Sequence, residues 1–118
     1  MRILIVEDEP AVADTLADAV RLQGHDPAVA RSGAEGLAAI EAHAPEALFL
    51  DLVMPGLSGI ELIREIRERH PDLPIVVVTG RAAHIDLDEV RQLGVTDIVE
   101  KPWALKLLDE ALGSLPLA

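Results

Sequence analysis

Four short apolar runs in this chain each lead directly into a charged or hydroxyl-bearing residue. The runs cover residues 2–6, 47–50, 75–78 and 98–100, and they are followed by Glu7-Asp8-Glu9, Asp51, Thr79 and Lys101. If the runs are neighbouring parallel strands, their carboxyl ends meet at one edge of a sheet, where ligands bind in open α/β folds. The sequence therefore predicts a site built from strand ends.

Amphipathic segments alternate with the strand-like runs, which is the pattern of a doubly wound α/β domain. Proline is favoured at the first helical position, and serine or aspartate followed three residues later by glutamate is typical of a capping box or its analogue. We therefore expect helices that begin at Pro10, Ser32, Ser58 and Asp86, with the first ending at Gly24, the fourth near Gly94, and a fifth helix over residues 104–113.

The order of the strands follows from their composition. The runs at 47–50, 75–78 and 98–100 are nearly continuous in apolar residues, as expected for strands covered by helices on both faces. The weaker strand at 27–30 contains a proline, which suits a sheet edge. We predict one domain over residues 1–118: a flavodoxin-like doubly wound (βα)5 three-layer sandwich, with a parallel sheet in the order 2-1-3-4-5.

Charge and composition exclude several classes of function. The chain has 21 acidic and 10 basic side chains and a net charge of -11, so it would repel a nucleic-acid backbone, and we expect no direct nucleic-acid partner. The absence of cysteine excludes disulfides and thiolate catalysis. No apolar stretch approaches the roughly 20 residues of a membrane span. We therefore expect a cytoplasmic protein with no membrane partner.

The residues at the strand ends suit phosphoryl chemistry with a metal ion. The switch point between the first and third strands would bring Glu7, Asp8 and Asp51 together, and three carboxylates that repel one another favour a bound cation. Mg²⁺ prefers such oxygen ligands. Asp51, on the central strand, is the candidate nucleophile toward phosphorus, while Thr79 and Lys101 can donate to phosphoryl oxygens.

Each of these residues also has a plain structural explanation. The acids at 7–9 favour the positive end of a helix, Asp51 can cap a strand end, and Lys101 can be a solvated charge near Glu100. We favour the functional interpretation because these residues all stand at the ends of the four strand-like runs. The histidines at 25, 43, 70 and 84 lie on different segments without ligand-like spacing, and we assign them no chemistry.

The chain resembles the receiver domain of two-component response regulators over nearly its full length. The resemblance rests on residues 6–9, 51–59 and 78–80 and on Lys101-Pro102, all in the order and spacing of the family. It implies that Asp51 accepts a phosphoryl group, in a Mg²⁺-dependent reaction, from the phosphohistidine of a sensor histidine kinase or phosphotransfer protein.

The resemblance also implies a role for each motif residue. Asp8 and Asp51 would be magnesium ligands together with the Val53 carbonyl, and Glu7 would assist through water. Thr79 and Lys101 would bind the phosphoryl group, and a cis Lys101-Pro102 peptide would orient the lysine. The domain would phosphorylate and dephosphorylate only itself, so it is not an enzyme for an outside metabolite.

One position departs from the family pattern and bears on signalling. Many receivers carry an aromatic residue three positions before the lysine, where this chain has Ile98, and its only aromatic residues are Phe49 and Trp103. The conformational switch at Thr79, Ile98 and Pro102 would therefore lack its aromatic part. We expect phosphorylation to be read through residues 80–85 and the fourth helix, on the face formed with the fifth strand and fifth helix. That face would control a separate output protein or domain, since we expect no output domain within residues 1–118.

Three other functions compete with this interpretation. A phosphorylation-independent pseudo-receiver that binds partners constitutively is suggested by Ile98 but disfavoured by the retained Asp51, Thr79 and Lys101. A flavin-binding protein of the same topology would need phosphate donors where residues 7–9 are acidic. A phosphatase with an aspartate nucleophile would need a second acid two residues after Asp51, where Val53 stands.

Overall fold

Strands and helices alternate along the part of the chain that the structure, a computed structural model, describes: residues 1–52, 59–79 and 87–100. The elements are β1 Arg2–Val6, α1 Pro10–Leu22, β2 Asp26–Ala30, α2 Gly33–His43, β3 Ala47–Asp51, α3 Gly59–Arg69, β4 Ile75–Thr79, α4 Leu87–Gln92 and β5 Asp97–Glu100.

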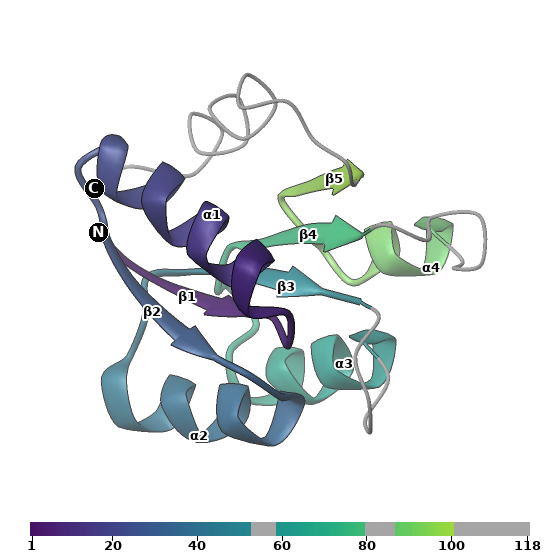
Figure 1. Cartoon of the computed structure of the whole chain (residues 1–118). Coiled ribbons are helices and arrows are strands. Elements are labelled where there is room, and N and C mark those ends of the chain that lie inside the picture. The colour runs from purple at the N-terminus through teal and green to yellow at the C-terminus, as the bar shows by residue number, and fades with distance from the viewer. Residues whose placement is uncertain (53–58, 80–86, 101–118) are drawn as a thin grey trace.

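The strands form one parallel sheet in the order β2-β1-β3-β4-β5, as predicted (Figure 1). In the register of neighbouring strands Val6 lies opposite Leu50, and Asp51 lies opposite Val78. Thr79 lies opposite Glu100 on β5. The strands therefore end close to one another at a single edge of the sheet, which is the condition for the predicted site.

Helices cover both faces of the sheet, with α1 on one face and α2 and α3 on the other (Figure 1). Alternate residues of each strand point to opposite faces. Ile3 and Ile5 therefore pack in one cluster with residues of α1, and Leu4 and Val6 pack in a second cluster with residues of α2, α3 and α4. This arrangement confirms the predicted layers for the described residues. The predicted helix at 104–113 lies outside them.

The ends of the helices follow the sequence signals in most places. Helix α1 begins at Pro10, and Gly24 beyond its end has the left-handed φ of +82°. Ser32 caps α2 by accepting from the Glu35 amide, but the Glu35 carboxylate accepts from the Arg31 amide and so completes the box one residue early. The predicted caps at Ser58 and Asp86 lie outside the described residues.

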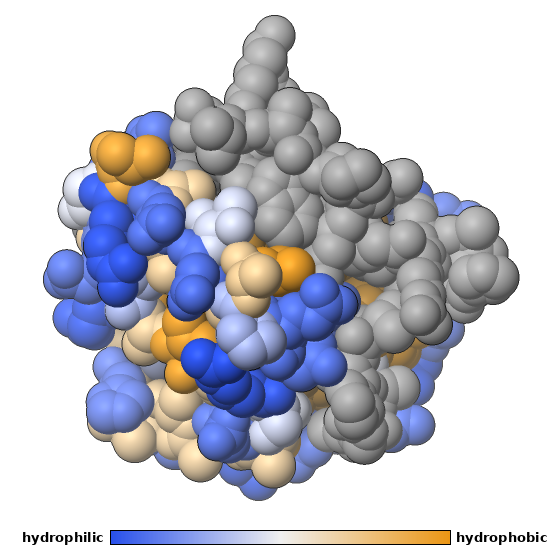
Figure 2. Space-filling view, viewed as in Figure 1, coloured by the Kyte–Doolittle hydropathy of each residue, from blue (hydrophilic) through white to orange (hydrophobic). Residues whose placement is uncertain are grey.

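The edge strand and the outer side of α1 face solvent. Strand β2 is at the edge of the sheet, so the proline at position 27 costs no central ladder bond. The view over α1 is mostly hydrophilic with separate apolar patches (Figure 2), and the large exposed apolar side chains among the described residues are Leu22 and Val29. None of the described helices has the length and apolar character that crossing a membrane requires.

Gly59, the first residue of α3, approaches the backbone that follows Asp51. Its amide donates to the Leu52 carbonyl at 3.3 Å. A Cβ at this position would lie 2.5 Å from Leu52 Cα and 2.7 Å from Leu52 O, which is closer than real Cβ atoms come to other atoms. The contact between α3 and the segment after β3 therefore requires glycine here.

We expect Gly59→Ala to lower the free energy of unfolding by about 1–3 kcal/mol, because the backbone at Leu52 must shift. Gly36→Ala in α2 is the matched control. Its Cβ would meet the methyl groups of the buried Val6 at 3.0 and 3.3 Å, a tight contact with a side chain and not with backbone, and alanine gains up to about 1 kcal/mol of helix propensity. Urea unfolding measures the free energy of unfolding of both variants. Equal losses in the two variants would show that the contact with Leu52 is not the cause of the loss at Gly59.

Candidate functional site

The chain turns Glu7 into the protein where β1 ends. The Glu7 side chain is fully buried, its amide donates to the Ala30 carbonyl at 3.0 Å, and its carboxylate accepts from the Asp8 amide at 3.1 Å. Glu9 is exposed at the N-cap of α1 and makes no side-chain capping bond. The explanation of these acids as simple helix-end charges therefore fits Glu9 but not Glu7.

Asp51 meets this pair from the end of the central strand. It is the last residue of β3 and is 5% exposed. One carboxylate oxygen each of Glu7, Asp8 and Asp51 lies within 4.8 Å of the others. The predicted convergence of these three side chains is thus present in the structure.

Such a cluster favours a bound cation. Two ionised carboxylates at this separation repel by about 3 kcal/mol at an effective dielectric constant of about 20. Two of the three groups are buried, so water screens the repulsion poorly. The cluster offers only hard oxygen donors, which match the preference of Mg²⁺. Glu7, Asp8 and Asp51 can therefore hold a metal ion.

Of the other predicted site residues, some lie on described strands and others lie outside the described part of the chain. Thr79 ends β4 beside the strand that carries Asp51, and Lys101 follows directly on the last residue of β5. Lys101, Pro102 and Val53 lie outside the described residues. Ile98 is half-buried in β5, where it packs against the cluster beneath α3. Its aliphatic side chain thus belongs partly to the core.

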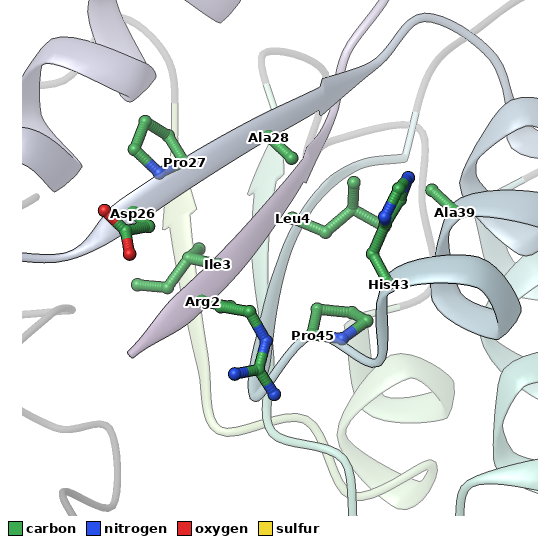
Figure 3. A pocket seen from close by; sticks show the side chains of 9 residues that line it. All are labelled: Arg2, Ile3, Leu4, Asp26, Pro27, Ala28, Ala39, His43 and Pro45. Atoms are coloured by element: carbon green, nitrogen blue, oxygen red, sulfur yellow. The ribbon is translucent and has the colours of Figure 1, made fainter.

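A cavity of about 230 Å³ lies at the opposite end of the strands, between β1, β2 and α2 (Figure 3). Arg2 and Asp26, the first residues of their strands, lie at its rim with His43, and the remaining lining is aliphatic or proline. The Arg2 guanidinium donates to the Ala44 carbonyl and lies 3.6 Å from Glu46. None of the acidic cluster faces this cavity, which therefore plays no part in the site.

Comparison with known proteins identifies the family. The family model of the response regulator receiver domain matches residues 3–113. The chain belongs to this family. As the resemblance predicted, it is therefore a receiver domain of two-component signalling.

Individual relatives agree with this assignment. Response regulator MprA of Mycobacterium avium (strain 104) is 38% identical over 108 residues, which are 92% of this chain and 47% of that protein. A sensor protein from Polaromonas sp. JS666 superposes with a TM-score of 0.88 and 34% identity over 97% of this chain and 94% of that one. The receiver domain of NtrX from Brucella abortus gives 0.87 and 33% over 98% and 99%. The chain spans about half the length of the curated relatives it matches.

The structure also shows polar contacts that the sequence analysis missed. Arg64 and Arg67 of α3 bind groups at α4. Both arginines lie on a charged helix face, which without tertiary structure is indistinguishable from a solvated one. No spacing rule pairs them with residues more than twenty positions away.

We expect Mg²⁺ to stabilise the wild-type receiver domain by about 2.7 kcal/mol at a hundredfold excess over its dissociation constant. Asp8→Asn should lose most of this gain, yet unfold at higher temperature than wild type in chelator, because one of three repelling charges is removed. Thermal unfolding with Mg²⁺ and with chelator measures both effects. Glu9→Gln, a neighbouring exposed acid outside the cluster, is the control and should behave as wild type; an Asp8→Asn response to Mg²⁺ equal to that of the control would contradict the metal site.

Proposed function

We propose that this receiver domain is a phosphorylation-switched module that accepts a phosphoryl group on Asp51 in a Mg²⁺-dependent reaction. The observation that supports it best is the group of three carboxylates around Asp51, at the edge where β4 ends in Thr79 and β5 leads into Lys101. In this proposal Asp51 is the nucleophile, Asp8 and Glu7 assist the metal ion, and Thr79 and Lys101 supply a hydroxyl group and a positive charge.

The reaction is an in-line displacement at phosphorus. An oxygen of the Asp51 carboxylate forms a bond to phosphorus while the bond between phosphorus and the histidine nitrogen of the donor breaks. The electron pair of that bond stays on the imidazole, which takes a proton from solvent. Hydrolysis reverses the state of Asp51: water attacks the phosphorus, the bond to the carboxylate oxygen breaks, and inorganic phosphate leaves.

The residues around Asp51 have separate tasks in this scheme. Asp8 and Asp51, with the Val53 carbonyl, would hold the ion, and Glu7 would orient a water of its hydration shell. Bound Mg²⁺ would offset the negative charge that the phosphoryl oxygens bring toward the Asp51 carboxylate. Thr79 would donate its hydroxyl to one phosphoryl oxygen, and Lys101, oriented by Pro102, would place its ammonium beside another.

The partners follow from this chemistry. The donor would be a sensor histidine kinase or a phosphotransfer protein, and the receiver would control an output protein or domain through the face of α4, β5 and the fifth helix. The net charge of -11 argues against nucleic-acid binding by these 118 residues themselves. Cytoplasmic location remains the expectation for such a module.

We expect wild-type protein to gain the mass of one phosphoryl group when it is exposed to acetyl phosphate with Mg²⁺, and to gain none in chelator. Asp51→Asn should gain none in either condition, because the amide is not a nucleophile toward phosphorus. Intact-mass spectrometry measures all four samples.

The outcomes separate the competing functions. A gain of equal size in Asp51→Asn would show that another residue is the acceptor. No gain in wild type, with the small donor and with a histidine kinase, would favour the constitutive pseudo-receiver, for which the aliphatic Ile98 is the one supporting feature.

A further inference from the structure

Helix α4 depends on α3 for its position. The structure describes six helical residues in it, Leu87–Gln92, and so few residues do not form a stable helix in isolation. Val90 is fully buried in the cluster that it shares with Leu62, Ile63 and Ile66 of α3. Two arginines of α3 add polar contacts to α4. The contact at one end of α4 differs in kind from the contact at the other end.

Arg67 binds the carboxyl-terminal end of α4. Its guanidinium donates to Leu93 O at 2.8 Å and to Gly94 O at 3.0 Å, just beyond the last helical residue. It also donates to Leu73 O at 2.6 Å and to His70 O at 3.1 Å, so it joins the end of α4 to the end of α3 and to the start of β4. We call these four bonds the Arg67 clamp.

The clamp is strong for physical reasons. Burial lowers the pKa of Arg67, and the charge of Asp72 offsets part of this shift, but guanidinium groups stay protonated in proteins. A planar fork of donors matches several carbonyls at once, whereas a lysine ammonium cannot span them. The amide of Thr96 also donates to Ile75 O at 2.7 Å, which fixes the turn after Gly94 to β4.

The amino-terminal end of α4 is held differently. Glu89, in its first turn, forms an ion pair with Arg64, one turn before Arg67 on α3. Both side chains are partly open to water, 54% exposed for Arg64 and 34% for Glu89. Exposed ion pairs contribute little to stability and break readily. We call this pair the Arg64–Glu89 latch.

We propose that α4 pivots about its carboxyl-terminal end, which the Arg67 clamp fixes, and that opening of the Arg64–Glu89 latch releases its amino-terminal end. That end is joined through residues 80–86 to Thr79, at the edge of the sheet that carries Asp51. The link to phosphorylation rests on the proposed function: a phosphoryl group on Asp51 favours the open latch, and by reciprocity an open latch favours phosphorylation.

Amide hydrogen exchange of the unphosphorylated protein tests the pivot without any phosphoryl chemistry. Glu89→Gln and Arg64→Gln should each raise exchange at residues 90–92 about two- to fivefold, the range of an exposed ion pair, and leave residues 93–96 unchanged. The double variant should raise exchange by less than the sum of the two single variants, because both remove the Arg64–Glu89 pair.

Asp88→Asn is the matched control. Asp88 lies in the same turn of α4 and pairs with Arg91 at 3.4 Å, but within the helix and not across to α3. Its exchange pattern should stay that of wild type. Equal exchange in Asp88→Asn and Glu89→Gln, or additive effects in the double variant, would overturn the latch.

Arg67→Lys tests the clamp. Exchange should rise at residues 93–96 by more than at 90–92 in the latch variants, because several charge-assisted bonds are lost together. If Arg67→Lys loosened residues 90–92 and spared 93–96, the assignment of the pivot would be wrong. Should Arg67→Lys not fold, the latch variants still decide which end of α4 opens.

The coupling to Asp51 is measured by amide exchange at residues 90–92 in Mg²⁺, before and after phosphorylation with acetyl phosphate. Phosphorylation should raise this exchange about two- to fivefold in wild type and Asp88→Asn, and by less in the latch variants, in which the pair is already broken. Unchanged exchange on phosphorylation, with raised exchange in the latch variants, would overturn the coupling and leave the pivot. If wild type itself takes up no phosphoryl group, the proposed function fails, and the exchange data alone decide the pivot.

Discussion

The parallel register of β1, β3 and β4 is the constraint on which the site depends. Each strand sends alternate side chains into two cores, with Ile3 and Ile5 toward α1 and Leu4 and Val6 toward α2 and α3. A slip of one residue would exchange these faces along the whole strand. The packing that fixes the register therefore also fixes Asp51 beside Glu7 at the strand ends.

The burial of carboxyl groups at the site lowers the stability of the fold. Glu7 and Asp51 are carboxyl groups taken almost fully out of water, and each is within 4.8 Å of another acid. Burial of carboxyl groups beside one another costs stability, because each charged form loses its hydration. Local rules of folding are broken in this way mainly at functional sites. The hard oxygen donors of this cluster fit a cation such as Mg²⁺.

Most of the fold could be read from the sequence because its signals are local. Unbroken apolar runs indicated β3 and β4 as central strands, the proline at position 27 indicated an edge, and Ser32 indicated the start of α2. The convergence of Glu7, Asp8 and Asp51 followed from topology alone. Two features could not be read from the sequence. The Glu35 carboxylate accepts from the Arg31 amide and not from the Ser32 amide, and the spacing of the residues does not decide between these neighbouring donors. The arginines of α3 find their partners only once α4 is in place.

Helix α3 connects the two regions that signalling must join. At its first residue, Gly59 touches the backbone of Leu52, which follows Asp51 directly. One and two turns further on, Arg64 and Arg67 contact the two ends of α4. The helix between these contacts has three residues, Leu62, Ile63 and Ile66, buried against the sheet, so it resists bending. We infer that a displacement at Leu52 would be passed through α3 to α4, and that the exposed pair of Arg64 and Glu89, the weakest of these contacts, would break first.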